Sequence, residues 1–133
     1  MAELQCIVVT PEETVRDEPA DFVSLTLFDG EIGIGPGHTP MIGRMGSGEM
    51  RLRRGGETAR FYVEGGFVEV AGNTVSILTN RALPAEDVDA EVAAEQLASA
   101  RSRPANTPEL MAIRDRAIRQ SRAQIRVARR AKQ

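Results

Sequence analysis

Several residue types are scarce in this chain of 133 residues, and each scarcity excludes a class of structure or site. There is no tryptophan and only 4% of the residues are aromatic, so any core has to be built from aliphatic side chains. Cys6 is the only cysteine, which excludes an internal disulfide, and with His38 as the only histidine a structural zinc site is not expected. We expect Cys6 to be a small buried strand residue rather than a catalytic one.

Long hydrophobic runs are absent as well. No apolar stretch approaches the roughly 20 residues that a bilayer span needs. The N-terminal sequence MAELQCIVV lacks the basic start and the long apolar segment of a secretory signal. Together with the single cysteine, these features predict a soluble protein in a reducing, cytoplasmic setting.

Lys132 is the only lysine, so arginines supply nearly all of the positive charge. This charge is unevenly distributed along the chain. Residues 1–85 carry 7 basic and 12 acidic groups, whereas residues 105–133 carry 8 basic and 2 acidic groups. The formal net charge of −2 therefore hides an acidic body with a basic tail. Such a tail indicates an acidic partner.

The first part of the chain shows the two-residue period of β-strands. In residues 21–28, Val23 and Leu25 alternate with Ser24 and Thr26. Glycine-containing turns at residues 55–56 and 71–73 separate further short runs of this kind. Strands are expected at residues 4–9, 21–28, 48–53, 60–63, 67–70 and 75–78. Their spacing predicts an antiparallel sandwich or barrel.

After Pro84 the pattern changes to that of helices. Residues 86–101 contain no glycine or proline and predict a first helix. Thr107 and Pro108 are typical of an N-cap and first helical position, so a second helix is expected from there to about Ala131. The two form an αα-hairpin. The apolar face of the second helix is expected to hold Leu110, Met111, Ile113, Ala117, Ile118, Ile125 and Ala128, with Arg116, Arg119, Arg122, Arg126 and Arg130 largely opposite.

Residues 29–42, DGEIGIGPGHTPMI, concentrate glycine, proline and the single histidine. We expect a shaped loop presented at the edge of a sheet, where function commonly lies. The glycines match neither a P-loop nor a dinucleotide fingerprint, because no Gly-Lys-Ser/Thr and no helix follow them. His38 is interpreted as a hydrogen-bonding residue that fixes the loop or meets a partner, with general-base catalysis as the less favoured alternative.

The basic second helix has three interpretations. It is a solvated helix, a nucleic-acid binder that follows phosphates, or a docking element that lays arginines against a carboxylate-rich protein surface. The acidic body and the shortage of aromatic residues disfavour nucleic acid. Protein docking is favoured, because solubility alone does not need such a one-sided charge.

The order of several motifs resembles the epsilon subunit of F-type ATP synthases, which is called delta in mitochondria. These motifs are CIVVTP at residues 6–11, GEIGIGPGHTPMI at 30–42, VEGGFVEV at 63–70 and VSILT at 75–79. The resemblance implies a β sandwich of about ten strands followed by a C-terminal antiparallel α-helical hairpin. It assigns residues 1–84 to the sandwich domain and residues 85–133 to the hairpin as a regulatory domain.

The resemblance also implies a function without catalysis, cofactor, metal or nucleic acid. The sandwich of such subunits binds the gamma subunit and the membrane-embedded c-ring, and couples ion-driven rotation to ATP synthesis. The subunit is peripheral, on the cytoplasmic side of the inner membrane, and touches the membrane only through the complex. The implied c-ring and gamma interface consists of Glu31, Ile32, Gly33, Pro36, Gly37, His38 and Pro40.

In bacterial members the hairpin extends along gamma and blocks ATP hydrolysis, with basic residues near an acidic segment of the beta subunit. The matching residues are Arg116, Arg119, Arg122 and Arg126. Some members bind ATP between the helices, which points to Asp89, Arg122 and Arg126 as nucleotide contacts. Here Val92 stands where their signature has an arginine, so tight ATP binding is not expected. Gly35 replaces a large apolar residue, which should loosen the loop.

Two alternatives from other classes stay open at this point. One is a small β-sandwich hydrolase or lyase that uses His38 with Glu31. The other is a nucleic-acid-binding protein that acts through residues 105–133, with steeply salt-dependent binding.

Overall fold

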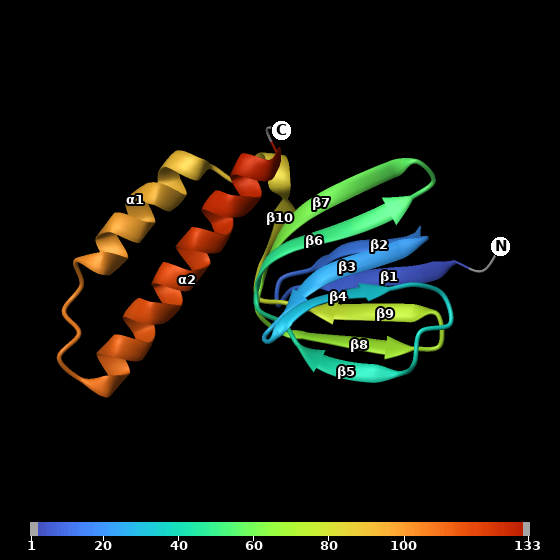
Figure 1. The fold of residues 1–133 in the computed structure, drawn as a ribbon, viewed down its shortest axis with the longest axis horizontal. Helices are drawn as coiled ribbons and strands as arrows, with labels where there is room; N and C mark the ends of the chain where they lie inside the picture. The colour runs from blue at the N-terminus through green and yellow to red at the C-terminus, as the bar shows by residue number, and fades with distance from the viewer. Residues whose placement is uncertain (1–2, 132–133) are drawn as a thin grey trace.

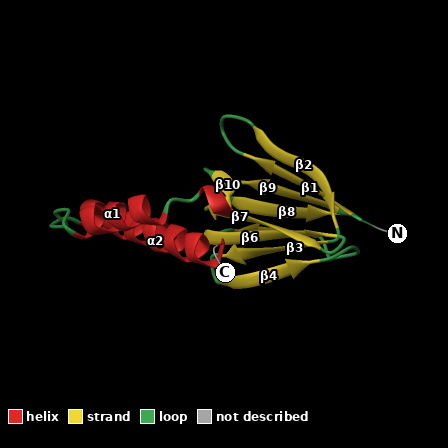
Figure 2. Ribbon diagram, turned by 90° about the horizontal axis from the view of Figure 1, so that it is seen from above, coloured by secondary structure: helices red, strands yellow, loops and turns green. Residues whose placement is uncertain are grey.

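The computed structural model describes residues 3–131, and its ten strands form two stacked five-stranded sheets that precede the helices (Figures 1 and 2). Sheet A has the order β2-β1-β9-β8-β5, with strands Thr14–Ala20, Leu4–Val9, Thr74–Leu78, Phe67–Ala71 and Met41–Arg44. Sheet B has the order β10-β7-β6-β3-β4, with strands Ala82–Pro84, Glu57–Glu64, Ser47–Arg54, Phe22–Leu27 and Gly30–Ile34. The predicted sandwich followed by two helices is confirmed.

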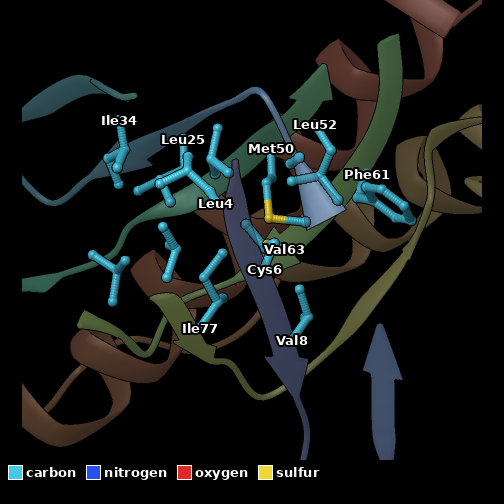
Figure 3. Close-up of a cluster of buried hydrophobic side chains, with 14 of the residues drawn as sticks. Leu4, Cys6, Val8, Leu25, Ile34, Met50, Leu52, Phe61, Val63 and Ile77 are labelled. Atoms are coloured by element: carbon cyan, nitrogen blue, oxygen red, sulfur yellow. The ribbon is translucent and has the colours of Figure 1, made fainter. Parts of the chain in front are cut away.

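The core lies between the two sheets and is aliphatic, as the composition requires. Each strand turns every second side chain inward, so β1 buries Leu4, Cys6 and Val8 and leaves the residues between them half-buried. Figure 3 shows these side chains facing those of the opposite sheet, among them Met50 and Phe61. The prediction that Cys6 is a buried strand residue is confirmed. Burial, helped by two nearby carboxylates, raises the pKa of its thiol to about 12.

The expectation of purely antiparallel pairing is wrong for one strand pair. β1 pairs antiparallel with β2 but parallel with β9, in the register Cys6–Val75 and Val8–Ile77. The hairpin turns that the sequence reveals report only on neighbouring strands, and β1 and β9 are far apart in the chain. β2 was not predicted, because its sequence TVRDEPA is charged and contains proline, as an edge strand tolerates.

The expectation of one continuous loop over residues 29–42 is also wrong. Residues 30–34 form edge strand β4 and residues 41–44 form edge strand β5, which leaves only residues 35–40 as the connection. Gly33 fits a strand because the ring of Phe22 covers it, and a Cβ added there would lie 2.5 Å from that ring. An aromatic neighbour of this kind stabilises a strand glycine that propensity alone disfavours.

The helical hairpin begins later than predicted. Residues 85–87 form a short 3-10 turn, η1, and α1 spans Ala90–Arg101. The carboxylate of Asp89 caps α1 by accepting hydrogen bonds from the backbone nitrogens of Glu91 and Val92, at 2.9 and 3.2 Å. α2 spans Pro108–Ala131 and starts where predicted, with the hydroxyl of Thr107 accepting from the backbone nitrogen of Leu110 at 3.1 Å.

The apolar face predicted for α2 is mostly not the buried one. Leu110, Met111 and Ile113 are exposed, whereas the buried residues of α2 are Ser121, Ala123, Gln124, Val127 and Ala128. The reason is the placement of the hairpin, which projects from one end of the sandwich (Figure 1). Only the C-terminal half of α2 packs on it, where Ala123 and Val127 meet Tyr62 and Ala85.

Candidate partner-binding surfaces

Residues 35–40 form the end of the sandwich that lies opposite the helical hairpin, and we call this end the loop pole (Figure 1). Its backbone is held from two sides. The backbone nitrogen of Gly37 donates to Oδ1 of Asn73 in the β8–β9 turn at 3.0 Å, and that of His38 donates to the carbonyl of Gly35 at 3.2 Å. Gly37 has a φ of 78°, a conformation that favours glycine. The loop pole is therefore a shaped surface rather than a slack connection.

His38 uses its ring within the loop. Nδ1 donates to the carbonyl oxygen of Thr39 at 2.7 Å. Within residues 3–131, no ion pair joins His38 to Glu31 or to another carboxylate. The geometry thus supports the interpretation of His38 as a loop-fixing residue and offers the hydrolase alternative no partner for its base.

The residues predicted for the c-ring and gamma interface differ in accessibility. Ile32 and His38 are half-buried, and the exposed residues are Glu31, Gly33, Pro36, Gly37 and Pro40. Ile32 packs against the core, and Ile34, two residues further along the same strand β4, is fully buried. The loop pole accordingly offers backbone groups, the rings of Pro36 and Pro40, and the polar side chains of His38 and Thr39. Gly35 needs no special φ, and a Cβ there would meet only Phe22 at 3.7 Å.

A second surface is apolar and lies on the outer face of sheet A. We call it the outer-face patch; its exposed hydrophobic residues are Ile42, Phe67 and Leu78, and the exposed Phe28 of the β3–β4 turn borders it. Phe67 of β8 pairs with Leu78 of β9 and with Arg44 of β5, so these side chains form a row across three strands. The guanidinium of Arg44 lies 5.0 Å from the centre of the Phe28 ring. A shallow hollow of about 810 Å³ adjoins Phe67 and Leu78.

Sequence reasoning missed the outer-face patch. Phe67 is 56% exposed and Leu78 54%, although the alternating pattern assigns outward positions to polar residues. The signal was present, because both residues stand at outward positions of strands whose inward positions are already apolar. Neighbouring exposed apolar side chains on a protein surface commonly mark a protein interface.

The basic side of α2 forms a third surface. Arg116, Arg119, Arg122 and Arg126 are all exposed, and within residues 3–131 none of them makes an ion pair. Arg116 differs from the others because it lines a polar groove of about 440 Å³ together with Arg81 and Arg103. The sequence prediction therefore placed four arginines correctly at the surface but did not separate Arg116 from the other three.

The residues predicted for nucleotide contact are not gathered around one hollow. Asp89 is occupied as the cap of α1, and the hollow beside it is lined by Arg81, Gln96 and Gln124 but not by Arg122 or Arg126. The guanidinium group there belongs to Arg81, which was not among the predicted residues. In this arrangement of the hairpin the three predicted residues do not form a common site.

Comparisons with known proteins identify the family. Residues 3–85 match the family model described as ATP synthase, Delta/Epsilon chain, beta-sandwich domain. The chain belongs to this family. An ATP synthase epsilon chain from Rhodopirellula baltica is 45% identical over 126 residues, which is 95% of this chain and 98% of that protein. One from Symbiobacterium thermophilum is 37% identical over an alignment that spans 96% of this chain and 94% of that protein. The predicted resemblance is confirmed.

Solved structures share the fold of this delta/epsilon family member. A chain in the OSCP/F1/c-ring structure of the Euglena gracilis mitochondrial ATP synthase superposes with a TM-score of 0.81 at 23% identity, over 99% of this chain and 82% of that one. One in the Tetrahymena thermophila central stalk and c-ring structure superposes with a TM-score of 0.72 at 14% identity, over 99% and 98%. In the described part of the chain, neither helix has the length and apolar character of a membrane span.

Proposed function

We propose that this chain is a non-catalytic subunit in the central stalk of an F-type ATP synthase, where it couples rotation of the c-ring to ATP synthesis. Membership of the delta/epsilon family carries this proposal, together with near full-length agreement with proteins named ATP synthase epsilon chain. In this role the sandwich, residues 1–84, is the coupling domain and the hairpin, residues 85–133, is regulatory. The subunit is peripheral on the cytoplasmic side of the membrane.

A subunit that transmits torque has to be stiff and has to bind two partners. The sandwich supplies stiffness through a close-packed core shared by both sheets. We assign two adjoining parts to the c-ring and its junction with gamma. These are the loop pole, with Pro36, Gly37, His38 and Pro40, and the neighbouring strand β4, with Glu31, Ile32 and Gly33. The outer-face patch is the larger apolar surface, and we assign it to the gamma subunit, since buried apolar area favours a lasting contact.

The hairpin suits an inhibitory role toward the beta subunit. Arg116, Arg119, Arg122 and Arg126 are exposed, and planar guanidinium groups pair well with carboxylates of an acidic segment. In the arrangement described here, the hairpin projects from one end of the sandwich and rests on it only through the C-terminal half of α2. Inhibition then follows from a second arrangement, extended along gamma, whose population the bound partners shift.

The first test is recovery of partners from native membranes with the tagged full-length chain. We expect the alpha, beta and gamma subunits to be recovered, and their absence would refute the central-stalk proposal. Phe67→Asp places a charge in the outer-face patch and should reduce this recovery strongly. Thr58→Asp, on an exposed position of β7 in the other sheet, is the matched control and should leave recovery unchanged.

The second test concerns inhibition and is independent of the first. The double variant Arg122→Gln/Arg126→Gln should raise ATP hydrolysis by the reconstituted complex, because it removes two contacts to an acidic partner. The control Arg53→Gln/Arg54→Gln removes the same charge from the exposed end of β6 and should have no effect. Equal hydrolysis by both variants and the parent would remove the inhibitory role and leave coupling untouched.

A further inference from the structure

A buried carboxylate lies beneath the end of α2, on the outer face of sheet B. Glu49 stands at an outward position of β6, directly across from Tyr62 of β7 in the strand register. Its side chain is only 7% exposed, because α2 crosses both strands at this point. Glu49 therefore belongs to the contact that joins the hairpin to the sandwich.

Three guanidinium groups surround this carboxylate, and they come from both parts of the molecule. Oε1 of Glu49 lies 3.4 Å from Nε of Arg51 and 3.4 Å from Nη1 of Arg60, on β6 and β7. It also lies 3.6 Å from Nη1 of Arg130, in the last turn of α2. Among the ion pairs of residues 3–131, only the one between Glu49 and Arg130 joins the sandwich to the hairpin.

The charges of Arg51 and Arg60 make the position of Arg130 depend on Glu49. With the carboxylate present, Arg130 is attracted to a negative charge that all three guanidinium groups share. Without the carboxylate, two guanidinium groups of the sandwich face a third on the hairpin, and like charges repel. Because Glu49 is largely shielded from water and salt, its attraction is screened less than that of an exposed pair.

The second oxygen of Glu49 opposes docking of the hairpin. Oε2 is buried and has no hydrogen-bond partner among residues 3–131. A polar atom buried in this way loses its hydration without compensation, and departure of α2 returns water to the carboxylate. The attraction of Arg130 and the loss at Oε2 offset each other in part, so this contact holds the hairpin reversibly.

Arg130 also belongs to the arginine row of α2. Its members, spaced three or four residues apart so that they share one side of the helix, are Arg119, Arg122, Arg126 and Arg130. The first three make no ion pair within residues 3–131. An acidic partner that lies along this row therefore reaches Arg130 only after Glu49 has released it.

We propose that Glu49 is an internal competitor for the acidic partner of α2. In the docked arrangement it occupies Arg130, and this ion pair holds the hairpin against sheet B. In the extended arrangement Arg130 joins the other arginines of the row on the carboxylates of the partner. Loss of the Glu49 charge shifts the population toward the extended arrangement. The docking contact stands on the isolated chain, whereas its effect on inhibition rests on the proposed function.

Tyr62 makes docking measurable in the full-length chain. It is the only tyrosine, there is no tryptophan, and its side chain is fully buried where Ala123 and Val127 pack on it. Acrylamide therefore quenches its fluorescence when the hairpin has left the sandwich. Arg130→Gln should raise the quenching constant about fivefold, the scale expected for loss of one partly buried ion pair.

The matched control removes the same charge from the neighbouring residue. Arg129 is exposed and makes no ion pair within the described part of the chain. Arg129→Gln should therefore leave the quenching of Tyr62 at the level of the parent chain.

A double variant gives the sharpest test of the ion pair. Glu49→Gln should open the hairpin more than Arg130→Gln does, because the guanidinium groups of Arg51 and Arg60 then repel the end of α2. In the Glu49→Gln background, adding Arg130→Gln should partly close the hairpin again, since it removes the repelled charge. A contact that acts only by packing predicts the opposite result, a further opening.

Two results would overturn the proposal. One is equal quenching of Tyr62 in Arg130→Gln and Arg129→Gln. The other is further opening when Arg130→Gln is added to Glu49→Gln. The first comparison alters only exposed side chains of α2, so it remains informative even where Glu49→Gln does not fold.

ATP hydrolysis by the reconstituted complex separates this proposal from the proposed function. Glu49→Gln should lower hydrolysis, because more of the hairpin is extended, whereas Glu57→Gln removes an exposed carboxylate of β7 and should have no effect. If quenching follows the prediction and hydrolysis is the same in all variants, the ion pair is supported as the docking contact and the inhibitory role of the hairpin is refuted.

Discussion

The sandwich and the helical hairpin are held by different kinds of contact. In the sandwich, large aliphatic side chains from two sheets fill one common core, with Val23, Ile34 and Ile77 fully buried. In the hairpin, the buried residues of both helices are mainly small or polar, namely Ala93, Ala100, Ser121, Ala123, Gln124, Val127 and Ala128. Because burial free energy grows with apolar area, the hairpin is held much more weakly than the sandwich.

This difference fits the two roles proposed for the chain. A closely packed sandwich resists deformation and suits the transmission of torque. A hairpin that rests on Tyr62 and Ala85 through Ala123 and Val127 separates from that surface at modest cost.

The largest effect is expected from Gly66→Ala in the sandwich. Gly66 has a φ of 100°, and a Cβ added there would lie 1.8 Å from the carbonyl oxygen of Leu78. Because the obstacle is backbone, β8 and β9 would have to separate, which costs about 3 kcal/mol or more. Urea unfolding should show the loss. Gly56→Ala is the control, because a Cβ there meets nothing within 4 Å, and an equal loss in both variants would contradict this explanation.

A cavity in each region should show how far the two regions unfold independently. Ile77→Ala in the sandwich core should lower the free energy of unfolding by about 3 kcal/mol. Val127→Ala under α2 should cost on the order of 2 kcal/mol, and only in the docking of the hairpin. Hydrogen exchange measures both effects. Val127→Ala should speed exchange in residues 108–131 and spare the strands, and uniform acceleration along the chain would show that the two regions unfold together.

Alkaline pH should destabilise the sandwich core and the contact beneath the hairpin, with each loss beginning at a different pH. Burial raises the pKa of Cys6 from 9.0 to about 12, so the folded state disfavours the thiolate and stability falls from pH 9 upward. The expected slope is about 1.4 kcal/mol per pH unit for one such group. Burial also raises the pKa of Tyr62 above 10.0, where its hydroxyl donates to Glu64 at 2.8 Å, so its contribution is lost only from pH 10 upward.

Urea midpoints against pH test this order. Cys6→Ala should flatten the decline that begins at pH 9, and Tyr62→Phe should flatten only the part above pH 10. If neither variant changes the slope, the burial of Cys6 and Tyr62 does not cause the loss of stability at alkaline pH.

The smallest effect is expected from the cap of α1. Asp89→Ala removes the acceptor for the backbone nitrogens of Glu91 and Val92 and should cost about 1 kcal/mol of helix stability. Asp87→Ala, in η1 just before the cap, removes an equal charge without a capping role and is the control. Faster exchange of the α1 amides in Asp89→Ala alone is the expected result.

Much of this fold was predictable from local patterns. Alternation in residues 21–28, the turn glycines at 55–56 and 71–73, and Thr107 before Pro108 each mark an element by a mechanism that acts over a few residues. The strands that sequence reasoning missed, at residues 14–20, 30–34, 41–44 and 82–84, are the edge strands of the two sheets, which depend on one neighbour for their form. The loop pole was found from composition, whereas the outer-face patch and the contacts of Glu49 with Arg51, Arg60 and Arg130 were not.

The two-part organisation, the aliphatic core, the turns and the basic character of α2 follow from the amino-acid sequence alone, because period, propensity and charge are local properties. Three other features appear only in the folded molecule: β1 lies parallel to β9, Leu110 and Ile113 of α2 stay exposed, and Glu49 meets arginines from three elements. These features depend on which segments far apart in the chain come together. That choice follows from the packing of the whole molecule and leaves no trace in a short stretch of residues.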